Sequence, residues 1–531
     1  MACMKSPNEV EDPERSTASA LQDADVHTCL KVLRAIEADR SHLTRLSRDA
    51  RRELVMLAGL VAKPERQDLV RMAKAFRRAD REAVKAHDRH AVEQAGLRVQ
   101  RRAAIYTPLR LEPPPAEGSA DEGAGEGPQL KRSRACYVCK RSFLRVHRYY
   151  DSMCGECGDF NYARRSQTAD LSGRIALITG ARVKIGFQAS LKLLRAGAQV
   201  IVTTRFPVDA VHRYAMEADY PQFRGRLQIH GLDLRHAPSV EIFTRFLLER
   251  LPRLDYLINN ACQTVRRPAG FFQHLLPRET EPLAALPEEW RAPLTLQDEL
   301  RRSLTGDGLP GARSPLARLP AANPQLSHAE GLLKSAELSQ RHYLDEDFQG
   351  GETLFPKDRY DVDLQQVDLR AVNSWRLRLH EVQTPELLEV HLVNAIAPYI
   401  LNARLKPLMQ RTALRDKHIV NVSAMEGQFY RTTKTDKHPH TNMAKAALNM
   451  MTRTSAPDFV KEGIHMNAVD TGWVTDEDPA LHAARKAECG FSPPLDIIDG
   501  AARIVDPIFA GLLTGTHLWG QFLKDYRPAP W

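Results

Sequence analysis

From Gly173 onward, short apolar segments alternate with longer segments that carry apolar residues at helical spacing. The short segments indicate buried β-strands, and the longer ones indicate amphipathic helices. Strands that alternate with helices are typical of a parallel sheet covered on both faces. The sequence therefore predicts an α/β fold with a doubly wound parallel sheet. The expected strands are residues 174–181, 199–205, 227–234, 254–262, 418–424 and 464–470.

The remaining segments differ in composition. Residues 1–23 are polar and expected to be disordered, residues 24–107 carry apolar stripes at helical spacing, and residues 108–132 are a Pro-, Gly- and acid-rich flexible linker. The α/β domain is expected over 170–531, with an insertion at about 264–386. This insertion follows the fourth strand, so it lies at the strand carboxyl ends, where open α/β sheets bind ligands. We interpret its flanks as a lid; the alternative is a disordered insertion without a role, which we expect for its low-complexity middle.

Composition excludes several classes of protein. The chain has 531 residues, 43% of them apolar, but no apolar run long enough to span a membrane. Its polar N-terminus lacks the apolar core of a secretory signal, so the cytoplasm is the default expectation. The net charge of +9 permits contact with nucleic acid, yet the arginine-rich runs are more typical of solvated helices. We therefore expect neither a membrane nor a nucleic-acid partner.

Two CxxC pairs, separated by fourteen residues, lie within residues 133–165, which we call the cysteine module. This spacing is typical of a tetrahedral zinc site with four thiolate ligands. Because the chain would supply all four ligands, the site is expected to be structural; a redox dithiol pair is the alternative. His147 is an alternative ligand that we interpret as a packing residue. The candidate metal ligands are Cys136, Cys139, Cys154 and Cys157.

A glycine-rich segment, TGARVKIG at 179–186, joins the first expected strand to a helix. Thr179 and Gly180 make the turn, and Gly186 allows close packing at the helix start, whose N–H groups face a diphosphate. Lys184 takes the place of the middle glycine of the usual pattern. Its side chain crowds the approach of a ligand to the backbone, although its ammonium group can contact phosphate. The segment predicts a dinucleotide site.

Further motifs follow in a familiar order: GLDLR at 231–235, NNAC at 259–262, HLVNAIAPYIL at 391–401, IVNVSAMEG at 419–427, NMAKAAL at 442–448 and NAVDTGWV at 467–474. Together with the glycine-rich segment, they make the chain resemble the short-chain dehydrogenase/reductase superfamily from Gly173 onward. The resemblance implies a Rossmann-like fold and an NADP(H)-dependent oxidoreductase acting on a carbonyl or alcohol. It also implies a homodimer formed through the helices that carry Asn394 and Lys445.

The resemblance also assigns cofactor contacts. Arg205 ends the second strand, where relatives hold the adenosine ribose, and arginine favours the 2′-phosphate of NADP(H) over NAD(H). Asp233 resembles the residue that bonds adenine, with a strand-end cap as its alternative role, and Asn259 resembles one near the adenosine ribose. The candidate cofactor residues are Thr179, Gly180, Arg182, Lys184, Ile185, Gly186, Arg205, Asp233, Leu234, Asn259, Asn260, Ala261 and Lys445.

The catalytic groups match only in part. Family chemistry couples hydride transfer to proton donation by a tyrosine, assisted by a lysine, a serine and an asparagine. Lys445 and Asn394 match this pattern, and Ser423 aligns with the first of two common serines, whereas the second is Ala424. The tyrosine position holds Thr441, whose aliphatic hydroxyl is a far weaker acid than a phenol. Two of the four catalytic groups are therefore absent.

Substitute proton donors lie close to this position. Tyr430 begins a Tyr-x-x-x-Lys pattern but precedes the expected helix. We therefore interpret the pattern as a coincidental match, unless the loop of Tyr430 folds inward. His438 and His440 directly precede the helix, and an imidazole is a competent general acid; the alternative is that both are exposed loop residues. We carry two hypotheses. The first is an NADP(H)-dependent oxidoreductase with an unknown small-molecule substrate. The second is an NADP(H)-binding pseudoenzyme that regulates or scaffolds a protein partner, bound through the N-terminal helices or the cysteine module.

Overall fold

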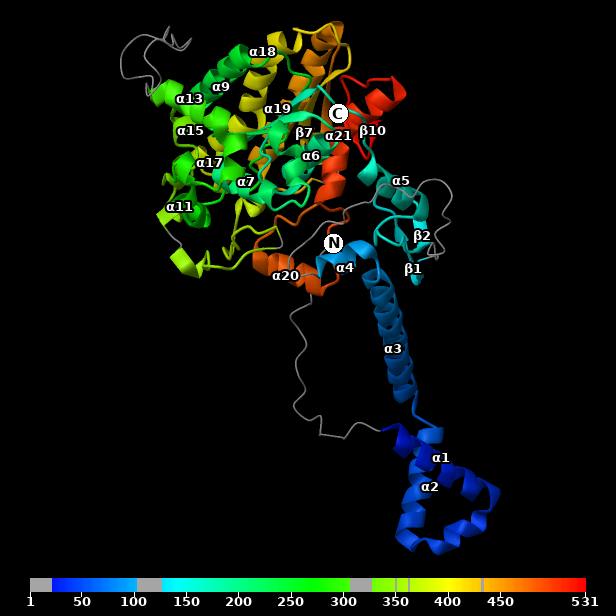
Figure 1. Ribbon diagram of the computed structural model, residues 1–531. Helices are drawn as coiled ribbons and strands as arrows, with labels where there is room; N and C mark the ends of the chain where they lie inside the picture. Colours follow the sequence, from blue (N-terminus) through cyan, green and yellow to red (C-terminus); the bar gives the residue numbers. More distant parts are fainter. Residues whose placement is uncertain (1–21, 103–126, 306–326, 349–350, 362, 431–433) are drawn as a thin grey trace. The chain divides into compact units, whose positions relative to one another are not determined.

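The computed structural model describes residues 22–102, 127–305, 327–348, 351–361, 363–430 and 434–531 (Figure 1). The chain forms two compact units, Met1–Asp88 and Arg89–Trp531. The boundary falls inside one long helix, so the helical region expected over 24–107 does not form a single unit. The expected disorder of residues 1–23 concerns residues outside the described part, except for the last two, which begin the first helix.

The described residues of the first unit, 22–88, form helices without a buried core. It contains α1 (Asp23–Ala38), the 3₁₀ helix η1 (Arg40–Arg45), α2 (Arg48–Ala62) and the first part of α3 (Arg66–Glu93). Neither α1 nor α2 has a buried residue. Large apolar side chains are instead exposed on these helices, namely Val26, Leu30, Val32, Leu33, Val55, Met56, Leu57, Leu60, Val61, Leu69, Val70, Met72 and Phe76.

An eight-stranded sheet organises the second unit, in the order β5-β4-β3-β6-β7-β8-β9-β10. All neighbouring strands are parallel except the β9–β10 hairpin. The strand order reverses between β3 and β6, which confirms the predicted doubly wound sheet. The strands are β3 (Ile175–Thr179), β4 (Gln199–Thr204), β5 (Leu227–Gly231), β6 (Tyr256–Asn259), β7 (Lys417–Ser423), β8 (Ile464–Asp470), β9 (Phe522–Lys524) and β10 (Arg527–Ala529).

Helices cover both faces of this sheet (Figure 1). Successive residues of a strand point to opposite faces, so Val200 packs in one core and Ile201 in the other. The first face carries α6 (Lys184–Arg195), α7 (Pro207–Ala215) and α21 (Ile497–Thr514). The second carries α9 (Ala237–Arg250), α18 (Ala397–Met409) and α19 (Pro439–Phe459). Shorter elements are α8 (Tyr220–Phe223), η2 (Arg224–Arg226), η12 (Met425–Gly427), η13 (Val460–Glu462) and α20 (Ala480–Glu488).

The cysteine module folds as a β-hairpin followed by a helix. Its elements are β1 (Gln129–Ala135), β2 (Ser142–Arg145) and α5 (Gly155–Ser166). Strand β1 begins inside the segment expected to be linker through residue 132, because Gln129 already pairs with Arg145 of β2. The module's apolar residues share a core with α4 (Gly96–Arg101) and with the start of α21, and this core includes Leu97, Tyr149, Tyr150, Leu495 and Ile497.

Buried charges reinforce this docking. The Nη1 atom of Arg165, at the end of α5, lies 2.7 Å from Asp496 and 3.0 Å from Asp499 at the start of α21. The hydroxyl of Tyr149 donates to Asp496 at 2.9 Å, and that of Tyr150 donates to Asp499 at 2.5 Å. The sequence-based expectation that the module docks on the α/β domain is consistent with these contacts.

The insertion between β6 and α17 (Thr384–His391) is largely helical where it is described. Phe271, Phe272 and Phe355 form a small core with Phe206 of the domain. Arg266 makes a buried ion pair with Asp347 at 2.6 Å. Most of the low-complexity middle lies outside the described residues. The helices are α10 (Ala269–Phe272), η3 (Gln273–Leu275), α11 (Leu276–Glu279), η4 (Leu283–Ala285), α12 (Glu288–Arg291), η5 (Ala292–Leu294), α13 (Thr295–Thr305), α15 (Glu330–Leu333), η7 (Glu337–Gln340), α16 (Asp345–Phe348), η8 (Gly351–Thr353), η9 (Ser374–Arg376) and η10 (Leu379–Glu381).

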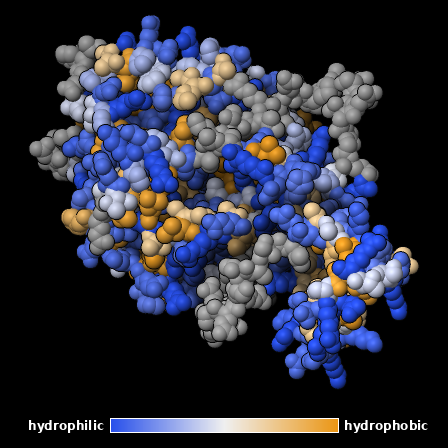
Figure 2. Space-filling view, turned by 90° about the horizontal axis from the view of Figure 1, so that it is seen from below, coloured by the Kyte–Doolittle hydropathy of each residue, from blue (hydrophilic) through white to orange (hydrophobic). Residues whose placement is uncertain are grey.

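Apolar side chains also reach the surface of the second unit. Hydrophobic patches between hydrophilic residues are visible on the face of the molecule in Figure 2. On α17, α18, α19 and the turn that joins the first two, the exposed large apolar residues are Leu388, Ile396, Tyr399, Met443 and Met450. Among the helices that the structure describes, none combines the length and apolar character needed to cross a membrane.

Candidate dinucleotide site and cysteine centre

The glycine-rich turn between β3 and α6 is packed tightly against the end of β6. Gly180 has φ +66°, and a Cβ atom there would lie 2.7 Å from Cα of Ala261. A Cβ atom on Gly186 would lie 2.3 Å from Nδ2 of Asn260. Asn260 donates from Nδ2 to the carbonyl oxygen of Thr179 at 3.0 Å, and the Thr179 hydroxyl accepts from the Ala261 N–H at 3.0 Å. Both glycines are therefore required by close contacts, as the sequence predicted for this turn.

Lys184 keeps the backbone conformation of the glycine that it replaces. Its φ is +54°, in the left-handed region where a non-glycine residue is strained. Its ammonium nitrogen lies 4.0 Å from Oδ2 of Asp363, a residue of the insertion. The next residue, Ile185, packs against Gly500 of α21 and against the core of the cysteine module. The lysine side chain thus faces a carboxylate from the insertion.

The two arginines predicted to hold the 2′-phosphate differ in their partners. Burial lowers the pKa of Arg205 to about 10, which leaves it cationic at neutral pH, and its guanidinium lies over the rings of Phe272 and Phe206. No hydrogen bond joins this guanidinium to another residue of the described chain. Arg182 is buried and pairs with Asp209 at 2.6 Å. Arg205 is therefore available to a ligand, whereas Arg182 is already paired.

Asp233, the residue predicted to bond adenine, is buried at the end of β5. Its carboxylate pairs with Arg235 at 2.6 Å, and its backbone N–H donates to Gly331 of the insertion at 2.8 Å. Leu234 follows it and is also buried. The insertion thus contacts the adenosine side of the predicted site directly.

The asparagines beside β6 point in different directions. Asn259 donates from Nδ2 to Asn402 and Asn421, both at 2.8 Å, inside the core. Its side chain therefore does not face the ribose position that the resemblance assigned to it. The amide of Asn394 binds the backbone of Gln263, accepting from its N–H at 2.8 Å. Asn394 lies in a π-helical turn, Leu392–Ile396, a distortion that is frequent at functional sites and that no sequence pattern predicted.

Two other residues at the family's catalytic positions, Lys445 and Ser423, form hydrogen bonds within the chain. Lys445 donates to the carbonyl oxygen of Val422 at 2.7 Å. Ser423 donates to Oδ1 of Asn449 at 2.6 Å, in a buried contact between β7 and α19. The hydroxyl of Thr441 is buried, with no hydrogen-bond partner within the described part of the chain. Ser423 thus makes a packing contact here. Thr441 stands at the family's tyrosine position, but its hydroxyl cannot supply a proton as a phenol does.

His440 is buried beside a carboxylate. Only 1% of the residue is exposed, and its Nε2 lies 3.4 Å from Oε1 of Glu386, which is also buried. Burial opposes the ionisation of Glu386, but His440 and Ser374 lower its pKa, so the carboxylate is charged at neutral pH. The alternative of an exposed loop histidine is wrong, because α17 and the insertion cover this position. No motif in the sequence indicated Glu386, because only tertiary packing brings it beside His440.

The other two candidate donors are less suited to proton transfer. His438 stacks on Trp375 of the insertion, with ring centroids 3.9 Å apart, and burial lowers its pKa to about 4. It is therefore neutral at pH 7 rather than exposed and titrating. Tyr430 is 55% exposed to solvent, so its side chain is not buried near the predicted site. Of the three candidates, only His440 is a buried group paired with a charge.

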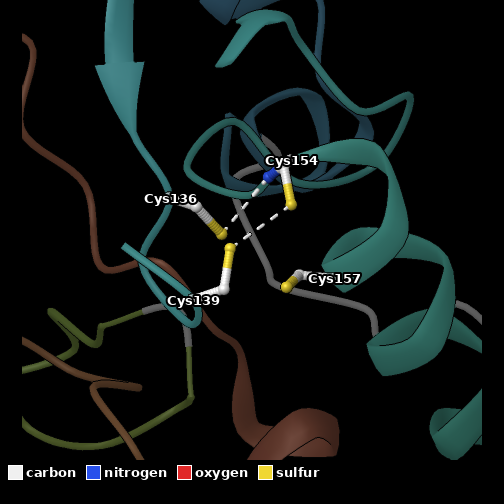
Figure 3. Close-up of side chains that lie close together, drawn as sticks. All are labelled: Cys136, Cys139, Cys154 and Cys157. Carbon is white, nitrogen blue, oxygen red and sulfur yellow. Dashed lines mark hydrogen bonds between the residues drawn. The ribbon is translucent and has the colours of Figure 1, made fainter. Parts of the chain in front are cut away.

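The four cysteines of the module converge on one point (Figure 3). Their sulfur atoms all lie within 4.8 Å of one another, and no other group of this kind occurs among the described residues. The Sγ atoms of Cys139 and Cys154 are 3.7 Å apart. His147 does not join them: its Nδ1 accepts the N–H groups of Tyr149 and Tyr150, both at 3.1 Å. Four sulfur ligands at this spacing fit a tetrahedral Zn²⁺ ion.

Two family profiles match the chain: short chain dehydrogenase over residues 174–281, and Enoyl-(Acyl carrier protein) reductase over residues 370–487. Uncharacterized protein R665 of Acanthamoeba polyphaga mimivirus is 30% identical over 413 residues, which cover 74% of this chain and 75% of that protein.

Relatives with a described activity match a shorter part. The WW domain-containing oxidoreductase of Drosophila melanogaster is 37% identical over 17% of this chain and 23% of its own length. Dehydrogenase/reductase SDR family member 13 of Bos taurus is 37% identical over 19% of this chain and 27% of its own. Among solved structures, the Pseudomonas aeruginosa RhlG/NADP complex is 17% identical, covers 67% of this chain and 95% of its own, and has a TM-score of 0.40.

Proposed function

Because the chain belongs to the short-chain dehydrogenase/reductase superfamily, we propose that it is an NADP(H)-dependent oxidoreductase that acts on a carbonyl or alcohol. NADPH, when bound, would supply the hydride. The chain's own residues would bind the dinucleotide, orient the substrate and provide a proton. The buried pair of His440 and Glu386, one residue before the family's tyrosine position, is the observation that carries this proposal.

Cofactor choice rests on the residues around the glycine-rich turn. Gly180 and Gly186 leave the backbone free of side chains where a diphosphate approaches a helix N-terminus. The unpaired guanidinium of Arg205 suits the 2′-phosphate of NADP(H). Purified protein should therefore bind NADPH more tightly than NADH, and Arg205→Asp should reduce or reverse this preference in a fluorescence titration. Equal affinities for the two dinucleotides would remove the argument for a 2′-phosphate contact.

His440 would hold the transferable proton, and Glu386 would act as a positioning residue. The carboxylate orients the imidazole and attracts its positive charge, as in other histidine-based general acids. Lys445 and Asn394 match the family. Lys445 would bind the nicotinamide ribose, and Asn394 would lie on the side of the substrate. His440→Gln should lower turnover by about 10²- to 10⁴-fold, with NADPH affinity unchanged.

Two variants separate this role from a structural one. Glu386→Gln should lower kcat and leave NADPH affinity and the melting temperature unchanged, because the neutral amide no longer holds the imidazole by charge. Tyr430→Phe is the matched control and should leave turnover unchanged, since Tyr430 is exposed. Turnover that survives His440→Gln would refute the assignment of the donor.

A second candidate function is an NADP(H)-binding pseudoenzyme with a regulatory or scaffolding role. The observation that favours it is that Lys445 and Ser423 are both bonded within the protein, while Thr441 and Ala424 replace the missing acid and serine. NADPH binding without turnover of any compound in a broad carbonyl panel would support this candidate over the first.

Two further assignments accompany the proposal. We assign a structural Zn²⁺ ion to Cys136, Cys139, Cys154 and Cys157, which would fix the hairpin of the module to α5. The exposed apolar residues along α17–α19 support a homodimer through this face. A protein partner for the N-terminal helices stays a prediction.

A further inference from the structure

A carboxylate from the insertion lies at the N-terminus of α7, directly after the strand that ends at the predicted ribose position. Glu279 of α11 accepts the N–H of Val208 through Oε2 at 3.1 Å and that of Asp209 through Oε1 at 2.8 Å. The first turn of a helix leaves such N–H groups free and favours negative charge. Glu279 therefore fills an anion position that begins three residues after Arg205.

The surroundings of Glu279 are those expected of a phosphate position. Glu279 is 9% exposed, and burial raises its pKa to about 7 even though the two amide groups and Arg182 favour its charged form. The charge of Arg182 acts on both Glu279 and Arg205, and Arg182 itself pairs with Asp209 at 2.6 Å. The guanidinium of Arg205 has no hydrogen bond or ion pair within the described chain, although Asp233 and Glu389 act on its charge. Two carboxylates, those of Glu279 and Asp209, thus interact with Arg182, and Arg205 is the cation without a direct partner.

A second insertion carboxylate faces the glycine-rich turn. Asp363 lies 4.0 Å from the ammonium group of Lys184, and its pKa is raised by burial but lowered by Lys184. Glu477, in the loop after β8, is partly buried, and Lys184 lowers its pKa as well. The ammonium group of Lys184, which could meet a diphosphate, thus lies beside a carboxylate of the insertion.

We propose that Glu279 and Asp363 are tethered competitors of the cofactor's phosphates: Glu279 for the 2′-phosphate and Asp363 for the diphosphate. The inference rests on the proposed binding of NADP(H) and extends it to regulation by the insertion. A dinucleotide must displace each carboxylate or accept like-charge repulsion, so the insertion lowers cofactor affinity. Because NADH lacks the 2′-phosphate, Glu279 opposes NADPH selectively, whereas Asp363 opposes both dinucleotides equally.

The first test uses Glu279→Gln, which keeps an oxygen that can accept a hydrogen bond from α7 but removes the charge. Titration of nicotinamide fluorescence should show that NADPH affinity rises about tenfold, within the usual range for coupled sites, while NADH affinity stays constant. Glu281→Gln, an exposed neighbour, is the matched control and should change neither. Equal changes for both dinucleotides, or a lower melting temperature with unchanged affinities, would show that Glu279 only caps the helix.

The second test uses Asp363→Asn, with the exposed Asp358→Asn as its control. The affinities for NADPH and NADH should rise by the same factor, and the control should alter neither. Unchanged affinities in Glu279→Gln and Asp363→Asn, with clear binding by the wild type, would overturn the inference and leave the proposed function intact. Binding of NADPH by the double variant alone would support the inference, whereas no binding by any of these proteins would overturn the proposed function and this inference with it.

Discussion

The cysteine module and the N-terminal helices both precede the α/β domain, yet they differ in the burial of their apolar residues and in the pairing of their charges. Aromatic and apolar residues of the module are buried in a core shared with α4 and α21, and Arg165 forms ion pairs inside it. The helices α1 and α2 have no buried residue, and Leu60 and Val61 are exposed. Amphipathic helices alone therefore do not make a core; the module has one because its charges and rings meet partners on α21.

The largest effect is expected from loss of the metal ligands. Cys154→Ser should abolish binding of one zinc per chain and lower the free energy of unfolding by about 5 kcal/mol or more. Metal analysis and thermal unfolding of the reduced protein would measure both. Cys29→Ser, which changes an exposed cysteine outside the cluster, should alter neither. Reduced, unchelated wild-type protein without metal would contradict the zinc assignment.

A somewhat smaller effect is expected from Arg165→Met. The change leaves Asp496 and Asp499 buried without their cation, and breaking a buried pair in this way costs about 3–5 kcal/mol. Denaturant unfolding should show this loss. Arg404→Met, which removes a largely exposed pair with Glu241, should have a much smaller effect, because solvent screens that pair. Similar losses in the two variants would show that the buried pair does not hold the module.

Acid should weaken the module through His147. Burial lowers its pKa below the usual 6.5, although Asp159 opposes this, so the folded state resists protonation. Its contribution to stability is complete above about pH 6.5 and is lost as the pH falls toward the folded-state value. His147→Asn keeps an acceptor for the N–H groups of Tyr149 and Tyr150 but cannot titrate. The melting temperature of the wild type should fall more between pH 7.5 and 5.5 than that of the variant; parallel curves would exclude this role.

The smallest effect is expected in the N-terminal helices. Leu60 is 62% exposed, so Leu60→Lys should change the free energy of unfolding by about 0.5 kcal/mol or less. Val146→Lys in the module, at a site that is 1% exposed, should be strongly destabilising. A large loss on changing Leu60 would mean that these helices have a buried interface in solution, as the predicted protein partner requires.

Short sequence patterns predicted the features that depend on residues close together in the chain. The apolar runs of β3 to β8, the close contacts of Gly180 and Gly186, and the convergence of four cysteines all follow from residues near one another in sequence. Charged pairs were not predicted, because His440 and Glu386, or Arg165 and Asp499, are brought together only by tertiary packing. The same reason explains why His438 and His440 are buried although they stand in a polar segment at the start of α19.

The family's residue roles also transferred unevenly. Gly180 lies in close contact with Ala261, and Asn260 bonds to Thr179, because the turn between β3 and α6 leaves little freedom. Asn259 and Ser423 keep the residue type but bond to Asn402, Asn421 and Asn449 in the core. Matching a side chain to a motif therefore does not determine the direction in which it points.

The position of the shared core has a practical consequence for producing a shortened protein. The first family profile begins at residue 174, so a shortened protein would commonly be designed to start near Gly173. Such a protein would lack Tyr149, Tyr150 and Arg165, and it would expose Leu495 and Ile497 beside two acidic residues that have lost their cation. It should be prone to aggregate during expression. A version that starts near Arg89 retains Ala91, Val92, Ala95 and Leu97, and it is the shortest form that we expect to be recovered in soluble, folded form.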